Sequence, residues 1–291
     1  MKKILFTGGT GFLGRNLVPV LQERYEVYAP TREALNLTDA QSIDSYFEGK
    51  YFDVIIHAAI PNLASGADCA DSLLKDSLYV FEKIASKKDS YGKMIYFGSG
   101  AEFDKAHDIA MVREDDFGVR VPENDYGFAK YMMNKICRQS DNLYNLRIFG
   151  CYGPTDAGFK LITSVIRQCI ANEDIILNQN CYFDFMYVKD IAYILDYFIN
   201  HTPKHHDYNM CTGIRTEIVS IAQMIKDKMQ AKGNIIVKKD GLNKEYTADN
   251  SRICQEIKGL SFTSLSDGID IMINAEMEYI DNEKKSCLYS S

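Results

Sequence analysis

Three glycines directly after a short apolar run constrain the fold of this chain more than any other feature. The apolar run is Ile4–Phe6, and the glycines are Gly8, Gly11 and Gly14. The pattern of an amphipathic helix follows at once over Arg15–Glu23. In a strand–turn–helix unit, such glycines let the chain reverse, admit a phosphate close to the backbone and let the helix pack on the strand. Because helix N-termini attract anions, we expect a dinucleotide site here. A purely structural turn is the alternative.

Composition excludes several classes of function. The 291 residues are 46% hydrophobic and 25% charged, which is typical of a soluble globular protein. The formal net charge of −7 argues against nonspecific nucleic-acid binding, which needs a basic surface. No apolar stretch reaches the length of a transmembrane helix. The eight cysteines form no C-x-x-C pair and have no metal-ligand spacing, so we expect free thiols in a cytoplasmic, metal-free protein.

Short apolar runs alternate with helical patterns along the first half of the chain, which predicts a parallel sheet with crossover helices. The predicted strands are Ile4–Phe6, Val27–Ala29, Val54–Ala58, Met94–Phe97 and Leu143–Phe149. The predicted helices are Arg15–Glu23, Ala40–Phe47, Leu73–Lys87 and Tyr126–Ser140.

The second half is less regular. It predicts helices over Phe159–Ala171, Asp190–Asn200 and Ile218–Gln230, and strands over Asp184–Val188 and Ile235–Lys238. The polar tail from about Glu283 is expected to be frayed. The fold class is therefore α/β, a doubly wound Rossmann sheet with a smaller interwoven α/β substrate cap. We expect residues 1–157 to form the dinucleotide-binding domain, with 184–207 returning to it, and residues 158–183 and 208–291 to form the cap.

The end of the second predicted strand bears on the choice between NAD and NADP. NAD sites usually place an acidic residue there to accept hydrogen bonds from the ribose 2′-hydroxyl. Here the strand runs into Thr31 and Arg32, and a guanidinium at this place can pair with a 2′-phosphate. We therefore predict NADP as the cofactor. In the alternative, Arg32 is solvated, Glu33 faces the ribose and NAD binds.

Hydride transfer to or from a carbonyl needs a proton donor beside the nicotinamide, and a tyrosine near a cation can serve. Tyrosine and lysine four residues apart share one helix face. This spacing occurs at Tyr46/Lys50, Tyr79/Lys83, Tyr126/Lys130 and Tyr131/Lys135. Only Tyr126/Lys130 opens a helix directly after a turn and N-cap sequence, at 122–125. It also lies 27 residues after Ser99, which follows the predicted strand Met94–Phe97 and so sits at its carboxyl end. We expect this pair to be catalytic.

The order of motifs along nearly the whole chain resembles the extended short-chain dehydrogenase/reductases, the NAD-dependent epimerase/dehydratase family. The glycine turn from Thr7 and the segment Tyr126-Gly127-Phe128-Ala129-Lys130 match its opening and its catalytic helix. The other matching motifs are Leu37-Thr38-Asp39, Asp53–Ala59, Tyr152-Gly153-Pro154, Asp184–Ala192 and Tyr208–Gly213.

The resemblance implies roles for these positions. Tyr126 would be the acid/base, Lys130 would lower its pKa and bind the nicotinamide ribose, and Ser99 would hold the substrate oxygen. The implied cofactor-binding residues are Gly8, Thr10, Gly11, Phe12, Leu13, Gly14, Arg32, Leu37, Asp39, Ala58, Ala59, Tyr126 and Lys130.

Departures from the family pattern narrow the reaction. Dehydratases carry Thr-Asp-Glu where this chain has Ser99-Gly100-Ala101. Glu102 follows at once, but alternation along an extended chain would point it elsewhere. The stretch from Pro30 to Asp39 is similar to that of GDP-L-fucose synthase-like 4-keto-sugar reductases.

Those synthases epimerise C3 and C5 with a cysteine and a histidine. Here Ala101 stands at the cysteine position, and no histidine occurs between Pro154 and His201. We predict NADPH-dependent reduction of a keto group, at C4, on a nucleotide-activated deoxy sugar without C3/C5 epimerisation. A C4-epimerase with tightly bound NAD is the first alternative, and a non-catalytic NAD(P)-binding sensor is the second.

The substrate residues are less well marked by the sequence. Arg147, Lys160, Arg215 and Arg252 are candidate diphosphate partners. Arg252 is preferred because Asp249–Arg252 resembles a late family segment. The resemblance also implies a homodimer, with a surface formed by Leu73–Lys87, Tyr131, Met132 and Lys135. An apolar stripe there is equally compatible with core packing.

Overall fold

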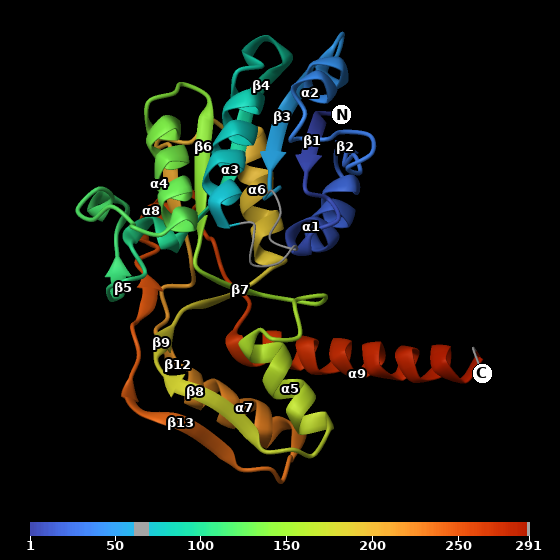
Figure 1. Cartoon of the computed structure of the whole chain (residues 1–291), viewed down its shortest axis with the longest axis vertical. Coiled ribbons are helices and arrows are strands. Elements are labelled where there is room, and N and C mark those ends of the chain that lie inside the picture. Colours follow the sequence, from blue (N-terminus) through green and yellow to red (C-terminus); the bar gives the residue numbers. More distant parts are fainter. Residues whose placement is uncertain (61–69, 290–291) are drawn as a thin grey trace.

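Six parallel strands form the centre of the structure, a computed structural model that describes residues 1–60 and 70–289 (Figure 1). The strands are β1 (Lys3–Thr7), β2 (Glu26–Tyr28), β3 (Phe52–His57), β4 (Tyr91–Ser99), β6 (Leu143–Ile148) and β11 (Asp207–Met210). The first five correspond to the strands predicted from the sequence. The sixth, β11, was not predicted.

The strand order places a binding crevice at the carboxyl ends of the strands, where the order reverses between β1 and β3. The order is β11-β6-β4-β3-β1-β2, and every neighbouring pair is parallel. From β1 the chain moves outward to β2 and then crosses back to lay β3 on the other side of β1. Such a switch point opens a crevice beyond the carboxyl ends of the strands.

Helices cover both faces of this sheet, as the continuous apolarity of its strands requires. One face packs on α1 (Phe12–Gln22) and α6 (Asp190–Asn200). The other face packs on α2 (Ala40–Phe47), α3 (Ala70–Ala85) and α4 (Asp125–Arg138). Successive strand residues serve the two faces alternately, so Ile4 and Phe6 belong to the first core and Leu5 to the second. The predicted doubly wound fold is confirmed.

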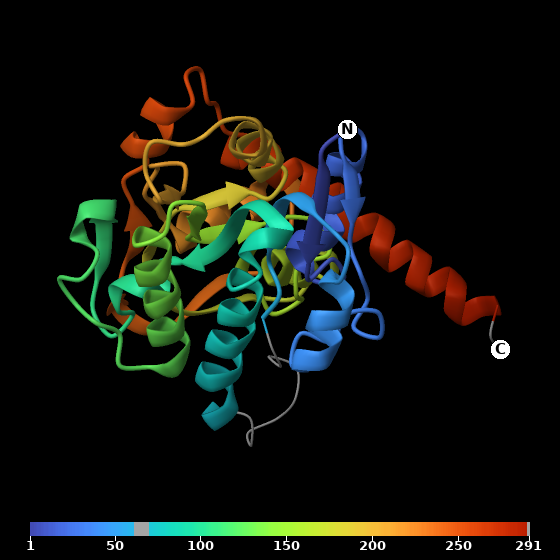
Figure 2. The same cartoon turned by 90° about the horizontal axis from the view of Figure 1, so that it is seen from above.

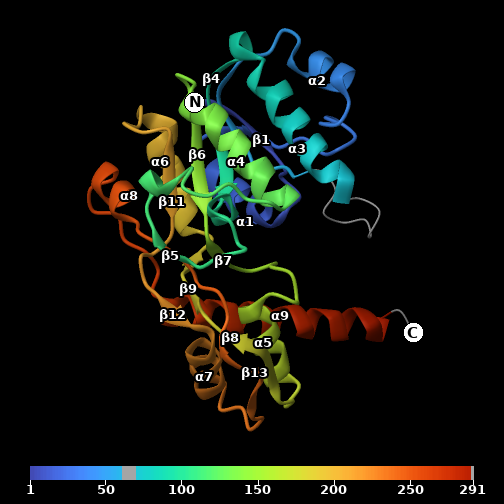
Figure 3. The same ribbon diagram turned by 60° about the vertical axis from the view of Figure 1, so that its left-hand side comes forward.

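A smaller α/β region lies beyond the carboxyl ends of the strands (Figures 1 and 3). It contains α5 (Leu161–Ile170), α7 (Ile218–Met229) and the parallel pair β8 (Ile175–Asn180) and β13 (Ile235–Leu242). A four-stranded sheet joins it to the nucleotide domain through β12 (Thr216–Glu217), β9 (Tyr182–Phe183), β14 (Tyr246–Ala248) and β5 (Ile109–Val112). The strands β7 (Gly150–Tyr152) and β10 (Phe185–Tyr187) form a further parallel pair.

Several details differ from the sequence-based expectation. Residues 207–210 form β11 of the main sheet, so the chain leaves that sheet later than the expected boundary at 208. The strand β5 comes from the first half of the chain but pairs with β14 of the cap. The expected frayed tail is instead the end of a long helix, α9 (Leu265–Tyr289), which extends away from the body (Figure 2). Its first turns are anchored by the buried Ile269 and Met272. A short helix, α8 (Ser251–Glu256), precedes it.

Candidate active site

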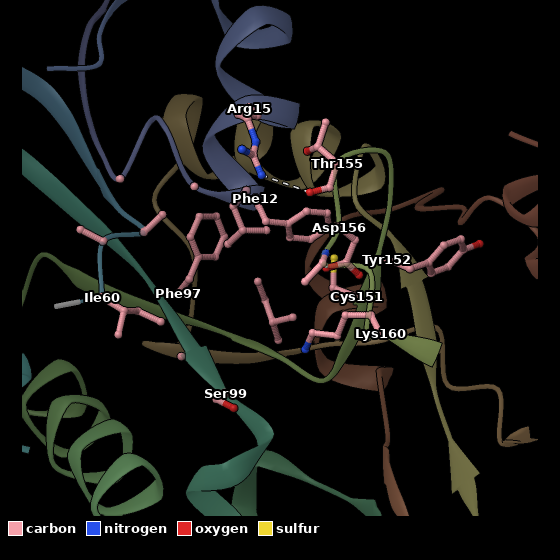
Figure 4. A pocket seen from close by; sticks show the side chains of 18 of the residues that line it. Phe12, Arg15, Ile60, Phe97, Ser99, Cys151, Tyr152, Thr155, Asp156 and Lys160 are labelled. Carbon is pink, nitrogen blue, oxygen red and sulfur yellow. Dashed lines mark hydrogen bonds between the residues drawn. The ribbon is translucent and has the colours of Figure 1, made fainter. Parts of the chain in front are cut away.

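A cavity of about 1180 Å³ lies between the carboxyl ends of the sheet and the cap. This exceeds the usual size of a pocket for one small molecule, so there is room for a dinucleotide and a second ligand. Figure 4 shows Phe97 and Ser99 on β4, Phe12 and Arg15 at the start of α1, and Lys160 across the cavity. Arg15 also donates to the Thr155 carbonyl at 3.1 Å and so ties α1 to the loop after β7.

The glycine turn is built for close approach of an anion. Gly8 has φ +79°, a conformation that disfavours other residues, and a Cβ on Gly9 would lie 2.9 Å from the Ala29 Cβ. A Cβ on Gly14 would meet the carbonyls of Gly8 and Gly9, which explains the third glycine. The helix α1 begins after Gly11 with no side-chain cap and no acidic residue in its first turn. Its N–H groups therefore suit a pyrophosphate at the cavity wall.

The residues at the far end of the cavity, near the loop after β2, bear on the choice between NADP and NAD. Arg32 and Leu37 line the cavity, as do Ala58 and Ala59. Glu33 does not line it. A hydrogen bond from Thr31 lowers the pKa of the Glu33 carboxyl, with the nearby Arg32 charge as a smaller cause. This end of the cavity therefore offers a guanidinium and no carboxylate from the loop after β2.

The predicted catalytic residues meet at the other end of the cavity. Asn124 caps α4 by accepting a hydrogen bond from the Gly127 N–H at 2.8 Å, which places Tyr126 in the first turn. Lys130 lies one turn later, and its Nζ donates to the Phe97 carbonyl at 2.9 Å. Its ammonium is 5.8 Å from the centre of the Tyr126 ring. Ser99 ends β4, and all three residues line the cavity.

Burial controls the protonation of this group. It raises the pKa of Tyr126 above its usual value, a hydrogen bond with Ser99 opposes the shift, and the charge of Glu102 adds to it. Burial also lowers the pKa of Lys130 to about 8, which the charge of Glu102 opposes. Desolvation of the phenol is thus the largest influence on the pKa of Tyr126, and the lowering of that pKa by Lys130 remains a prediction.

Residues 4–211 match the NAD dependent epimerase/dehydratase family. The chain belongs to this family. It is an NAD(P)-dependent oxidoreductase, and the resemblance seen in the sequence motifs is confirmed. A CDP-abequose synthase from Yersinia pseudotuberculosis is 26% identical over 253 residues, which cover 77% of this chain and 85% of that protein.

Solved structures of other proteins share the fold. A GDP-L-fucose synthetase from Naegleria fowleri bound to NADP superposes with a TM-score of 0.84 at 19% identity, over 96% of this chain and 94% of that one. A GDP-mannoheptose C4 reductase from Campylobacter jejuni with NADP bound has a TM-score of 0.80 at 20% identity, over 95% of this chain and 98% of that one. These likenesses establish the architecture.

Most of the cofactor residues that the family resemblance implies do line the cavity. They are Gly8, Thr10, Gly11, Phe12, Leu13, Arg32, Leu37, Ala58, Ala59, Tyr126 and Lys130. Gly14 and Asp39 do not line it. Gly14 packs α1 against the turn, and the Asp39 carboxylate caps α2 by accepting from the N–H groups of Gln41 and Ser42.

Glu102 lies away from the cavity for a different reason than expected. The chain after Ser99 is a 3₁₀ turn, η3 (Gly100–Phe103), and not an extended strand. The fully buried Glu102 carboxylate accepts from Arg147 Nε at 2.8 Å and from the Ser99 N–H at 3.1 Å. It supports the turn beneath Ser99 and is held by a cation, so it does not present an acid to the cavity.

Three of the four arginine and lysine candidates for the substrate diphosphate are engaged elsewhere. Arg147 is fully buried between Glu102 and Asp207. Arg252 pairs with Asp207, Glu114 and Asp115. It does not line the cavity, so the structure does not bring the preferred substrate residue to the site. Arg215 pairs with Glu245 and does not line the cavity either. Lys160, at the start of α5, is the candidate that does line it.

Two of the polar cavity residues that sequence reasoning missed, Lys105 and Tyr246, lie close to each other. Lys105 follows η3, and Tyr246 begins β14. The Tyr246 hydroxyl lies 3.4 Å from Ser99 Oγ, and the Lys105 ammonium lies 4.4 Å from the centre of its ring. Neither belongs to a motif with recognisable spacing, and Tyr246 reaches the site through a strand pairing that is remote in sequence.

The search for membrane-spanning helices and metal sites covers only the part of the chain that the structure describes. Within residues 1–60 and 70–289, no helix is long and apolar enough to cross a membrane, and no group of histidine, cysteine and acidic residues is arranged to hold a metal ion. Six cysteines are free thiols: Cys137, Cys151, Cys169, Cys181, Cys211 and Cys254. Cys69 and the side chain of Cys287 lie outside what the structure describes.

Proposed function

We propose that the protein reduces a keto group, at C4, of a nucleotide-activated deoxy sugar with NADPH, and does so without C3/C5 epimerisation. The observation that carries the proposal is the cavity itself. It joins an anion-binding glycine turn at one end to Ser99, Tyr126 and Lys130 at the other. The similar proteins include a CDP-abequose synthase and a GDP-mannoheptose C4 reductase, and both names support a nucleotide-sugar substrate.

The protonation of Tyr126 favours reduction. Bound NADPH supplies the hydride. Because the pKa of Tyr126 is raised, its hydroxyl keeps its proton at neutral pH and can give it to the oxygen of the carbonyl that is reduced. Ser99 donates a hydrogen bond to the same oxygen, and the nearby Lys130 cation stabilises the negative charge that develops on Tyr126.

The loop after β2 favours NADP. Arg32 lines the cavity, where its guanidinium can meet a 2′-phosphate with two parallel hydrogen bonds. Glu33, which an NAD site would direct to the ribose, does not line the cavity.

The positions at which C3/C5-epimerising synthases carry a cysteine and a histidine argue against that epimerisation, which needs an acid and a base beside the sugar ring. Ala101 supplies neither, and the described residues that line the cavity include no histidine. Cys151 does line it, but burial raises the pKa of its thiol well above the usual range. A protonated, buried thiol is a poor base.

The oxidation of NADPH by a panel of GDP-, CDP-, UDP- and dTDP-linked 4-keto-6-deoxy sugars tests the proposal. We expect one of them to be reduced, with product that keeps its C3 and C5 configuration by NMR. Tyr126→Phe should lower kcat at least 100-fold while NADPH binding persists, because the proton donor is lost. Failure with every sugar, in folded protein that binds NADPH, would point to another carbonyl substrate.

The same preparation distinguishes the C4-epimerase alternative. An epimerase would carry NAD through purification and interconvert nucleotide sugars without net consumption of NADPH. We expect the purified reductase to bind added NADPH reversibly and to oxidise it stoichiometrically with product formation. We also propose that it works in the cytoplasm, as its free thiols suggest.

A further inference from the structure

Tyr246 places a third hydroxyl at the end of the cavity that holds the hydroxyls of Ser99 and Tyr126. Its ring is buried between Phe149 and Phe183, with ring centres 5.2 and 5.3 Å away. These contacts, together with the Lys105 ammonium over the ring, fix the direction of the phenol. The hydroxyl therefore points at Ser99 Oγ, 3.4 Å away.

The hydrogen-bonding capacity of Ser99 shows what this contact can do. A serine hydroxyl has one hydrogen to donate and two lone pairs that accept. The Ala101 N–H donates to Ser99 Oγ at 3.2 Å and occupies one lone pair. If the Tyr246 hydroxyl donates to the other, the Ser99 hydrogen has one direction left, towards Tyr126 and the cavity.

We propose that Tyr246 is a positioning residue that acts through Ser99, by donating to Ser99 Oγ so that the serine hydrogen is aimed at the oxygen of the substrate carbonyl. The proposal rests on the reduction inferred above. Burial keeps the Tyr246 phenol protonated, so it remains a donor across neutral pH. The distance is long for a hydroxyl pair, and catalytic hydrogen bonds often tighten only in the complex with substrate.

The first test removes only the hydroxyl. Tyr246→Phe keeps the aromatic packing, and Tyr182→Phe is the matched control. Tyr182 lies on the neighbouring strand β9, and its hydroxyl donates to Glu217 at 2.6 Å, outside the cavity. With NADPH and GDP-4-keto-6-deoxymannose, we expect Tyr246→Phe to lower kcat on the order of tenfold, less than the loss of an oxyanion-hole donor itself. The KM for NADPH should not change, and Tyr182→Phe should stay within about twofold of the unaltered enzyme. Equal kcat values for the two variants would overturn the proposal.

A double-mutant cycle with Ser99→Ala identifies the route of the effect. If Tyr246 acts through Ser99, removing its hydroxyl in the Ser99→Ala background should change kcat by less than about twofold. A full tenfold loss in that background would mean that Tyr246 contacts the substrate directly or supports the fold, and would contradict a positioning role.

A structural readout does not depend on the identity of the sugar. In crystals of the Tyr246→Phe protein with NADP⁺, we expect Ser99 to occupy a second rotamer, because the hydroxyl partner that Tyr246 supplies is gone. The Tyr182→Phe protein should retain a single rotamer. A single, unchanged Ser99 rotamer in Tyr246→Phe would overturn the proposal even if the substrate proves to be a different carbonyl compound. Failure of every sugar nucleotide to react would instead count only against the proposed function.

Discussion

At the scale of single residues, the buried charge of Lys130 lowers the stability of the fold while the same side chain lines the cavity beside Tyr126. Its ammonium is buried, and burial lowers its pKa from the usual 10.5 to about 8. Below pH 8 the folded state holds a desolvated charge that the unfolded chain exposes to water. Between about pH 8 and 10.5 the unfolded state binds the proton and the folded state does not, so this penalty fades as the pH rises.

We therefore expect Lys130→Met to raise the free energy of unfolding at pH 7 by about 2 kcal/mol, after the loss of the bond to the Phe97 carbonyl is deducted. The gain should shrink towards pH 10, and turnover should fall at least 100-fold. Urea unfolding at pH 7 and 9.5 measures the first effect. Lys232→Met, at an exposed position in the loop between α7 and β13, should stay within about 0.5 kcal/mol of the unaltered protein. A Lys130→Met protein less stable than the unaltered one at pH 7 would refute this account.

Arg32 carries the cofactor prediction. A hydrogen bond to a charged group is worth about 1.5–3 kcal/mol, so Arg32→Ala should raise the KM for NADPH at least tenfold. The KM for NADH should hardly change, because NADH has no 2′-phosphate. Steady-state kinetics with both nucleotides gives the comparison, and Arg24→Ala is the control because Arg24 pairs with Asp196 on the surface. If the unaltered enzyme has a lower KM for NADH than for NADPH, the prediction that NADP is the cofactor is wrong.

At the scale of elements, the sequence predicted the bounded apolar runs of the main sheet and missed β11, whose polar residues are buried. β1 and β3 are bounded apolar runs, whereas β11 contains Asp207 and Asn209, which sequence patterns place in loops. Both are buried because Arg147 bonds to them, at 2.8 and 2.7 Å. Tyr246 was missed for a different reason, because only the pairing of β14 with β5 and β9 brings it to Ser99.

Arg147 on β6 bonds to residues of β11 and η3 and so holds these three elements together beneath the site. Arg147→Met should lower the free energy of unfolding by about 3–5 kcal/mol, because it leaves the buried Glu102 without its cation. Arg215→Met removes a partly exposed pair with Glu245 and should cost less than about 1 kcal/mol. Urea denaturation of both variants makes the comparison. Similar losses for the two would show that the buried network does not support β11 and η3.

At the scale of the whole molecule, α3 and α4 lie side by side over one face of the sheet and present the surface predicted to form a dimer (Figure 1). Part of that surface is already used within the chain, because Tyr131 stacks on Phe117 with ring centres 4.6 Å apart. Met132, half-buried on α4, is the apolar residue of the predicted surface that tests it most directly.

We expect sedimentation equilibrium to give twice the chain mass of 33.1 kDa. Met132→Glu should shift the protein to monomer, because each copy would bury an unpaired carboxylate at the interface, at a cost of several kcal/mol. Met277→Glu, at an exposed position on α9 away from that surface, should leave the mass unchanged. A monomer at every concentration of the unaltered chain would exclude the dimer. In that case the apolar stripe of α3 would serve only the packing of α3 against the sheet and α4.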